Sequence, residues 1–245
     1  MVFQKIILVI PTYNEAENLS RLVSVLLSLP LEGLSLLVVD DHSPDGTGQV
    51  AERLALEYPS KISILHRPGK QGLGTAYLEG FRLAFTSGAD VIGQMDADFS
   101  HPPEKLVELV QALDCCDVAM GSRYVSGGGV DQRWPIWRKG LSRFGNFYAR
   151  TLLRLPVRDV TGGFRVWKRV SLESLPLECV RSNGYAFLVE LTYLATKLGL
   201  SIREVPIYFT DRLWGVSKMS FKIQRESAIR VWQMMVEYRG LKRKG

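Results

Sequence analysis

Two acidic residues separated by a single alanine, Asp96 and Asp98, are the residues of this chain best suited to chemistry. They follow the apolar run 91–95, and Pro102 and Pro103 soon afterwards prevent the predicted strand from continuing. Side chains alternate between the two faces of a strand, so both acids are expected to point the same way. Two carboxylates this close repel each other, which raises one pKa unless a divalent cation neutralises the pair. Hard oxygen ligands of this kind suit Mg²⁺ or Mn²⁺, ions that commonly bridge to a substrate phosphate.

A simpler interpretation of the same acids is that they cap the helix expected over residues 103–113. On the local pattern alone, capping and metal binding both remain open. Two further polar sets favour a site, because each follows another apolar run: residues 11–15, and Asp40 with Asp41. Asp41, or else Asp40, is the candidate to hold a ribose or a base edge. The Gly-rich segment 69–74 precedes a helix and offers amides to an anion, although a plain loop explains it as well.

Strand-like and helix-like segments alternate through the first half of the sequence. Strands are expected over residues 5–10, 34–39, 62–66, 91–95 and 118–120. Asn14 is expected to cap the first helix, with Glu17 three residues later completing a capping box. This alternation predicts an α/β fold with a mainly parallel central sheet and helices on both faces. Such sheets bind ligands at the carboxyl ends of their strands, where the three polar sets fall.

The second half of the sequence departs from this alternation. Residues 133–158 interleave basic side chains with large apolar ones, which suits an interfacial helix at a membrane or, equally, a core helix with solvated charges. A strand is expected over residues 200–209 and a helix over 221–238. The basic tail 239–244 would add attraction to anionic lipid. No clear linker divides the chain, and we expect a single domain over residues 1–245.

Composition narrows the class of protein. The chain is 46% hydrophobic and 23% charged, as in an ordinary soluble globular protein. Its 31 Lys and Arg against 25 Asp and Glu favour anionic partners such as nucleic acid, phosphate-rich substrates or an anionic membrane, although a modest positive charge also aids solubility. Cys115, Cys116 and Cys179 do not resemble a disulfide framework and fit a reducing compartment. The absence of an apolar run of about 18 residues predicts no transmembrane helix.

Eight short motifs stand in order along the chain and together carry a resemblance. They are Pro11-Thr12-Tyr13-Asn14-Glu15, Val39-Asp40-Asp41, Ser43-Pro44-Asp45-Gly46-Thr47, Gly72-Leu73-Gly74-Thr75-Ala76-Tyr77, Asp96-Ala97-Asp98, Gly121-Ser122-Arg123-Tyr124, Thr161-Gly162-Gly163-Phe164-Arg165 and Ser217-Lys218. The ordered set resembles the dolichyl-phosphate (polyprenyl-phosphate) mannosyltransferases, inverting enzymes of glycosyltransferase family 2 with the Rossmann-like GT-A fold. Each motif alone is shared by many glycosyltransferases, whereas the ordered set is specific to the polyprenyl-phosphate branch.

The resemblance implies transfer of mannose from GDP-mannose to dolichyl or polyprenyl phosphate, with Mg²⁺ or Mn²⁺ on the donor diphosphate. The same reaction with another donor such as UDP-glucose stays open, because no base-reading residue separates guanine from uracil. A single GT-A domain is implied, with a nucleotide-sugar-binding half over about residues 1–125 and an acceptor and membrane-facing half over about 126–245. The enzyme would be peripheral, at the cytoplasmic face of a membrane. Small membrane-anchoring subunits are candidate partners, and nucleic acid is not.

The resemblance also assigns roles to individual residues. Asp96 and Asp98 would hold the metal ion, and Asp98 and Arg212 would be catalytic. The donor site would comprise Pro11, Tyr13, Glu15, Val39, Asp41, Asp96, Ala97, Asp98, Arg123, Arg212 and Lys218. The acceptor side would comprise Thr161, Gly162, Gly163 and Arg165. One departure is Ser100, which stands where some relatives have a glutamine as a further metal ligand, so metal coordination here is expected to rely on water.

A phosphate-monoester acceptor explains why no catalytic base stands out in the sequence. Its second pKa of about 6 leaves it mostly dianionic at neutral pH, so its attack on the sugar C1 needs no strong base. Glu190 is the runner-up acid, with a structural role expected. The two competing hypotheses, a nucleic-acid-binding protein and an oxidoreductase, account for fewer features of the sequence. A nucleic-acid-binding protein leaves the strand-end acids without a role, and a nicotinamide-dependent oxidoreductase needs GxGxxG where residues 11–15 stand.

Overall fold

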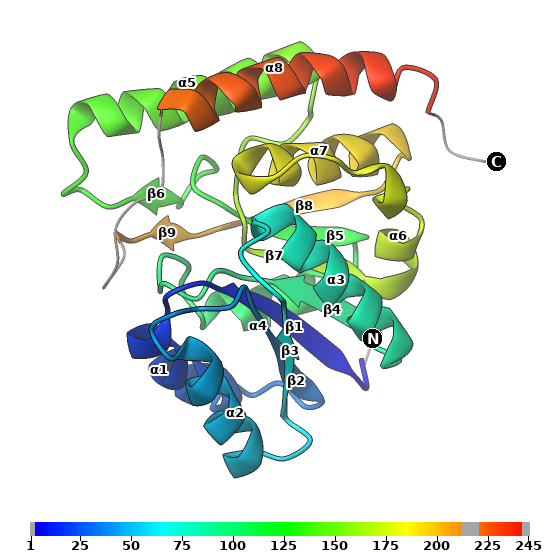
Figure 1. Ribbon diagram of the computed structural model, residues 1–245. Helices are drawn as coiled ribbons and strands as arrows, with labels where there is room; N and C mark the ends of the chain where they lie inside the picture. The colour runs from blue at the N-terminus through cyan, green and yellow to red at the C-terminus, as the bar shows by residue number, and fades with distance from the viewer. Residues whose placement is uncertain (1–2, 212–220, 242–245) are drawn as a thin grey trace.

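A seven-stranded sheet forms the centre of the protein, whose computed structural model describes residues 3–211 and 221–241. The strands of this sheet are β1 Ile6–Thr12, β2 Leu34–Asp40, β3 Ile62–His66, β4 Val91–Gln94, β5 Val118–Ser122, β7 Arg165–Lys168 and β8 Ile202–Pro206. In space they run β3-β2-β1-β4-β7-β5-β8 (Figure 1). Strand β7 is antiparallel to both of its neighbours, and the other described pairs of this sheet are parallel. The predicted α/β class and mainly parallel sheet are confirmed.

Helices cover both faces of the sheet, as the sequence predicts. One apolar core packs under α1 Ala16–Leu27, α2 Thr47–Glu57 and α4 Lys105–Ala112. A second core on the other face packs under α3 Leu73–Thr86 and α7 Gly184–Lys197. Successive residues of β1 contribute to the two cores in turn, which is why this strand is a continuous apolar run in the sequence. The shorter elements are α6 Arg169–Glu173, the 3₁₀ helix η1 Leu177–Cys179, and the paired strands β6 Gly129–Val130 and β9 Tyr208–Phe209.

The five strands expected in the first half are all present, with bounds shifted by at most two residues. The single strand expected over residues 200–209 is wrong, because the chain divides into β8 and β9 at Ile207. The Ile207 amide still donates to the carbonyl of Ser122, the last residue of β5, whereas the Ile207 carbonyl accepts from the Gly129 amide of β6. Strand β9 therefore leaves the main sheet and pairs with β6.

The capping box expected at the start of α1 is also wrong. Glu15 is the N-cap residue, and no side chain of its own caps the helix. Asn14 instead adopts a left-handed backbone conformation with φ of 61°. The loop after β2 caps the helix from outside, because Asp45 Oδ2 accepts from the Ala16 amide at 3.1 Å and Thr47 Oγ1 accepts from the Glu15 amide at 2.9 Å. A cap supplied from so far along the chain leaves no local pattern.

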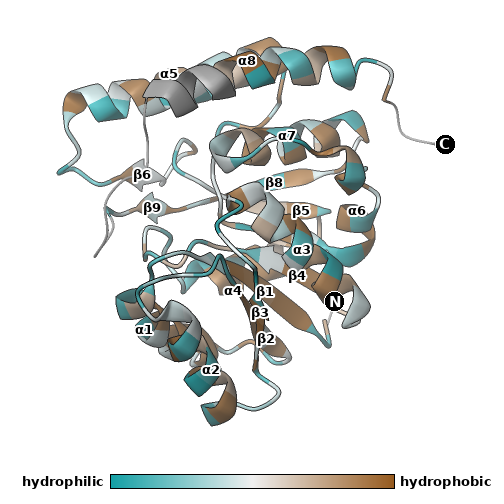
Figure 2. Ribbon diagram, viewed as in Figure 1, coloured by the Kyte–Doolittle hydropathy of each residue, from teal (hydrophilic) through white to brown (hydrophobic). Residues whose placement is uncertain are grey.

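The segment that interleaves basic and aromatic residues forms α5 Ile136–Leu153. It lies beside α8 Phe221–Glu237, and the two helices form a layer outside α7 (Figure 1). Apolar and polar residues are interspersed along α5 and along the coloured part of α8 (Figure 2). Four large apolar side chains of α5 are 63–87% exposed, so the core-helix interpretation is wrong for them: Ile136, Trp137, Phe144 and Phe147. Within the described ranges, no helix combines the length and apolar character that a membrane crossing requires.

Candidate active site

The predicted polar sets meet at one edge of the sheet because β2, β1 and β4 are neighbours. Pro11 pairs with Val39 near the ends of β1 and β2, so Asp41 leaves the sheet beside the segment 11–15. Strand β4 runs parallel to β1 on its other side and ends at the same edge, two residues before Asp96. This is the carboxyl edge of the parallel strands, where ligands bind in sheets of this kind.

Asp96 and Asp98 lie in the bend after β4. The negative charge of each carboxylate raises the pKa of two buried side chains, Tyr77 and His101. The Tyr77 hydroxyl donates to Asp96 Oδ1 at 3.3 Å. Burial raises the pKa of Tyr77 well above its ordinary value, and the Asp96 charge adds to the rise, so this hydroxyl stays protonated. The Ser100 hydroxyl and amide both donate to Asp98 Oδ1, at 2.5 and 3.1 Å. Ser100 therefore fixes the position of the Asp98 carboxylate.

His101 is 1% exposed, and its Nδ1 has no hydrogen-bond partner among the residues that the structure describes. The ring packs against the rings of Phe164 and Phe209, with centroids 5.5 and 5.3 Å away. Burial lowers the pKa of His101 by more than the charges of Asp96 and Asp98 raise it, so the imidazole is neutral at neutral pH. This buried ring nitrogen, beside two carboxylates, is an atom to which a polar ligand would supply a hydrogen bond.

The chemistry of this cluster suits a hard divalent cation. Asp96 and Asp98 are carboxylates, the ligands that Mg²⁺ and Mn²⁺ prefer. Across the part of the chain that the structure describes, no group of three or more His, Cys, Asp or Glu side chains is arranged as a complete metal site. Two carboxylates would leave the remaining ligands of such an ion to water and to a diphosphate.

Asp41 is held by the segment that follows β3. Arg67 is 2% exposed, and its Nη1 donates to Asp41 Oδ1 in a short contact. The other oxygen, Asp41 Oδ2, accepts from the Gly72 amide at 3.0 Å. The rest of the guanidinium donates to Glu79, at 3.2 Å from Nε and 3.0 Å from Nη2, and to the Thr75 hydroxyl at 2.8 Å. Asp41 is thereby a fixed carboxylate at the end of β2.

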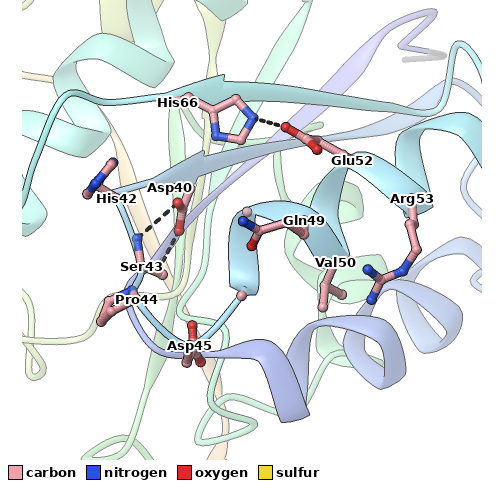
Figure 3. Close-up of a pocket in the computed structure, with 12 residues that line it drawn as sticks. Asp40, His42, Ser43, Pro44, Asp45, Gln49, Val50, Glu52, Arg53 and His66 are labelled. Carbon is pink, nitrogen blue, oxygen red and sulfur yellow. Dashed lines mark hydrogen bonds and ion pairs between the residues drawn. The ribbon is translucent and has the colours of Figure 1, made fainter.

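Asp40 lines a separate hollow of about 850 Å³ between the end of β2 and α2 (Figure 3). Its carboxylate accepts from the Ser43 amide at 3.1 Å and from the Ser43 hydroxyl at 2.5 Å. Across the hollow, His66 Nε2 lies 3.1 Å from the Glu52 carboxylate (Figure 3). Neither acid of the Asp96–Asp98 pair lines it. The bonds of Asp40 hold its own turn, which leaves the next aspartate as the candidate for the site.

Tyr13 and Glu15 lie on the loop between β1 and α1. The ammonium group of Lys70, from the Gly-rich segment 69–74, lies 3.9 Å from the centroid of the Tyr13 ring. The Glu15 carboxylate accepts from the Asn18 side chain at 2.7 Å. The Gly-rich segment therefore touches two candidate donor residues, Asp41 through an amide and Tyr13 through a cation–π contact.

Arg123 follows β5 and forms a buried ion pair with Asp159. Its Nε and Nη2 donate to the two carboxylate oxygens at 2.7 Å each, and Nη2 also donates to the Thr161 hydroxyl at 2.6 Å. Burial alone would lower the pKa of Arg123, but Asp159 raises it above its ordinary value. Burial would likewise raise the pKa of Asp159, and the arginine holds it below its usual range. Both groups are charged at neutral pH.

The acceptor-side motif makes a turn between this ion pair and β7. Gly163 lies between His101 and Asp96, because a Cβ there would lie 3.3 Å from His101 Cε1 and 3.5 Å from Asp96 Oδ2. Arg165 is 1% exposed and donates to three backbone carbonyls: those of Gly162, Leu188 and Val160. Burial lowers the pKa of Arg165 to about 10. Its contacts are those of a residue that fixes the shape of the turn.

Two predicted site residues, Arg212 and Lys218, fall outside the described residues. The structural role expected for Glu190 is confirmed. It is fully buried, accepts from the Ser182 amide at 2.9 Å, and accepts from Arg230 at 2.7 Å and the Tyr238 hydroxyl at 2.8 Å.

Sequence reasoning missed Arg67, His101 and Asp159 as parts of the candidate site. Each has an ordinary structural or solvated interpretation in the sequence. His101 carried a weak signal, since it follows the acidic pair by three residues. Arg67 and Asp159 had none, because their partners, Asp41 and Arg123, are 26 and 36 residues away.

Comparison with known proteins agrees with this architecture. The chain matches the family described as Glycosyl transferase family 2 over residues 7–175. "Polyprenol monophosphomannose synthase" of Mycolicibacterium smegmatis is 47% identical over 230 residues, which cover 93% of this chain and 86% of the relative. "Undecaprenyl-phosphate mannosyltransferase" of Micrococcus luteus is 42% identical over 240 residues, which cover 97% of this chain and 98% of the relative.

Two solved structures share the fold at low sequence identity. Glucosyl-3-phosphoglycerate synthase from Mycobacterium tuberculosis, in complex with Mn²⁺, UDP and phosphoglyceric acid, has a TM-score of 0.67 at 18% identity, covering 99% of this chain and 81% of that one. A mannosyltransferase from Pyrobaculum calidifontis, in complex with GDP-Man and Mn²⁺, has a TM-score of 0.66 at 17% identity, covering 97% of this chain and 65% of that one. With the strand order, the family match and the two curated relatives taken together, this chain belongs to glycosyltransferase family 2 and has the GT-A fold.

Proposed function

We propose that the protein transfers mannose, with inversion, from GDP-mannose to dolichyl or polyprenyl phosphate. One observation carries this proposal. The strand-edge site of Asp41, Asp96, Asp98 and Arg123 lies on a chain that is 47% identical to a protein named for polyprenol monophosphomannose synthesis. We place the whole reaction on a single domain, because the main sheet takes strands from both halves of the chain.

The donor is proposed to bind along the carboxyl edge of β2, β1 and β4. The nucleoside contacts are assigned to Pro11, Tyr13, Glu15, Val39 and Asp41. The diphosphate and sugar contacts are assigned to Asp96, Ala97, Asp98 and Arg123, with Arg212 and Lys218 from the part of the chain outside the described residues. Bound to Asp96 and Asp98, Mg²⁺ or Mn²⁺ would neutralise charge on the departing diphosphate. The neighbour that holds GDP-Man and Mn²⁺ shares this fold and supports the assignment.

The reaction needs little proton transfer. An oxygen of the dianionic acceptor phosphate attacks C1 of the sugar, and the C1–oxygen bond to the diphosphate breaks, with its electron pair leaving on GDP. The protein's task is then to orient the two substrates and stabilise the leaving charge. Arg212 is proposed as the cation that acts on the diphosphate, since Arg123 already shares its charge with Asp159.

The acceptor is proposed to approach from the turn that carries Thr161, Gly162, Gly163 and Arg165. Thr161 lies within hydrogen-bond distance of Arg123, which places the turn beside the donor residues. Gly163 brings the backbone of the turn close to both His101 and Asp96, since a Cβ there would lie 3.3 Å from His101 Cε1 and 3.5 Å from Asp96 Oδ2. Arg165 contributes by holding the turn, because its described contacts are backbone carbonyls of the protein.

A membrane surface is proposed to meet the layer formed by α5 and α8. Trp137, Phe144 and Phe147 are exposed on α5, at a spacing that places them along one side of the helix. Ile229, Trp232 and Val236 are exposed on α8 at i, i+3 and i+7, and they are 52–70% accessible. Arg143 and Arg150 are exposed on α5 as well, so the layer combines apolar anchors with positive charge. We place the enzyme at the cytoplasmic face, where free thiols such as Cys115 and Cys179 persist, with small anchoring subunits as further candidate partners.

Replacing Trp137, Phe144 and Phe147 together with serine is expected to weaken binding to vesicles that contain anionic lipid about 10²-fold. Each ring that leaves water contributes on the order of 1–2 kcal/mol. Vesicle co-sedimentation measures the effect. The control is Leu56→Ser, because Leu56 is 84% exposed but lies on α2, outside the layer formed by α5 and α8. Equal vesicle binding by the triple variant and the wild type would remove α5 from the membrane contact.

The experiment that tests the function is a donor panel. The full chain is given GDP-mannose, GDP-glucose, UDP-glucose or UDP-mannose, with a polyprenyl phosphate in detergent, and with Mg²⁺, Mn²⁺ or a chelator. We expect labelled sugar to pass to the lipid from GDP-mannose and to stop when the metal ion is chelated. Preferred transfer from UDP-glucose would keep the reaction class and replace the donor. The absence of transfer to the lipid from any donor would reject the proposal.

A further inference from the structure

Asn183 lies in the second half of the chain, yet its side chain binds the Gly-rich segment 69–74 of the first half. Its Oδ1 accepts from the Gly74 amide at 2.8 Å, and its Nδ2 donates to the Gln71 carbonyl at 3.1 Å. The same Oδ1 accepts from the Gly184 amide at 2.8 Å and caps α7. One side chain therefore caps a helix and fastens a loop that is more than 100 residues away in sequence.

The packing at this contact leaves no room for larger residues at two positions of the loop, Gly72 and Gly74. Gly72 has φ of +99°, and a Cβ there would lie 2.0 Å from Asn183 Nδ2. A Cβ at Gly74 would lie 2.6 Å from the carbonyl oxygen of Ser182. The two glycines thus allow the backbone of the loop to press directly against Ser182 and Asn183.

The opposite side of the same loop forms part of the proposed donor pocket. The Gly72 amide donates to Asp41 at 3.0 Å, and the Lys70 ammonium lies over the Tyr13 ring. The loop therefore lies between Asn183 and two residues assigned to the nucleoside. A shift of the loop would move both contacts at once.

The turn that carries Asn183 is itself firmly held. The fully buried Glu190 of α7 accepts from the Ser182 amide at 2.9 Å and from Arg230 of α8 at 2.7 Å. Arg230 Nε also donates to the Ser182 hydroxyl at 2.8 Å. Helices α7 and α8 thus give Asn183 a rigid base from which to fix the loop.

We propose that Asn183 is a positioning residue for the donor nucleotide: it holds the Gly-rich loop so that Asp41 and Tyr13 meet the nucleoside. The proposal rests on the proposed function, since it takes these two residues as donor contacts. It assigns a part in donor recognition to the acceptor half of the chain. Its effect falls on donor affinity, because Asn183 touches neither the acidic pair nor the acceptor-side turn through any bond described above.

Two substitutions separate the loop contact from the helix cap. Serine caps helices well but is too short to span to Gly74 and Gln71, so Asn183→Ser keeps the cap and removes both loop bonds. Aspartate also caps well, and Asn183→Asp keeps the acceptor for Gly74 while losing the donor to Gln71. Binding of GDP with Mg²⁺, and of UDP with Mg²⁺, is measured by calorimetry on the full chain. We expect GDP binding to weaken about tenfold in Asn183→Ser and about threefold in Asn183→Asp.

Steady-state kinetics distinguish positioning from general damage. In Asn183→Ser, KM for the sugar donor is expected to rise about tenfold, with KM for the lipid acceptor and kcat within twofold of the wild type. Arg169→Met removes an exposed ion pair with Glu173 on α6 and should change none of these values. Unchanged GDP affinity and donor KM in Asn183→Ser, with a wild type that binds GDP, would overturn the inference and leave the function standing. A wild type that binds neither GDP nor UDP would overturn both.

Discussion

Replacing Asp98 with alanine is expected to lower sugar transfer to the lipid acceptor about 10³-fold while the protein stays folded. Asp98 is one of two carboxylates assigned to the metal ion, and without it the charge of the leaving diphosphate is poorly neutralised. A factor of 10³ corresponds to about 4 kcal/mol of transition-state stabilisation. Folding should suffer less, because the carboxylate is bonded to the amide and hydroxyl of Ser100, whose loss is worth about 1–3 kcal/mol.

Two measurements separate the loss of the metal ion from the loss of the fold. Calorimetric titration with Mn²⁺ in the presence of GDP should show much weaker metal binding in Asp98→Ala, and circular dichroism should show the same secondary structure as the wild type. Asp114→Ala, at an exposed position after α4, is the matched control and should keep full activity. Full activity in Asp98→Ala would reject the metal assignment.

The sequence allowed the nucleotide-side architecture to be predicted because its elements are local. Each strand in the first half is a short apolar run, and each run ends in polar residues at the carboxyl edge of the sheet. Strand β7 was not predicted, because its formation depends on residues that are distant in sequence. It has only four residues with a charge at each end, and it forms by antiparallel pairing with β4 and β5, which lie far away in sequence. The periodicity of apolar residues does not indicate that a strand is inserted between β4 and β5.

In the candidate site, too, some residues can be predicted from the local sequence and others depend on distant partners. Asp96 and Asp98 can be identified from the sequence, because two acids at the end of an apolar run need an explanation. The residues that support the site cannot be identified in this way. Arg67, Asp159 and Asn183 acquire their roles only through partners that the fold brings close to them. Arginine, aspartate and asparagine are usually solvated. Only the structure shows that Arg67 and Asp159 are buried, at 2% and 0% exposure.

The ion pair of Arg123 and Asp159 carries the second large expected effect. Asp159→Ala is expected to lower the free energy of unfolding by about 3–5 kcal/mol, because it leaves the Arg123 guanidinium buried without its counter-charge. The cost is high since Arg123 is 8% exposed and its Nε and Nη2 both donate to the lost carboxylate. The Arg123 amide, which donates to Asp159 Oδ2 at 3.0 Å, loses its partner as well.

The double variant Arg123→Met with Asp159→Ala identifies the cause of this loss. It should be less destabilised than the sum of the two single variants, because no unpaired charge remains buried. Urea unfolding followed by circular dichroism measures all three proteins, and Glu173→Ala, which breaks an exposed pair with Arg169 on α6, should cost at most about 0.5 kcal/mol. Simple additivity in the double variant would show that the two side chains act separately. Sugar transfer should nevertheless fall in every variant that lacks Arg123, since the restored stability does not restore the guanidinium assigned to the donor site.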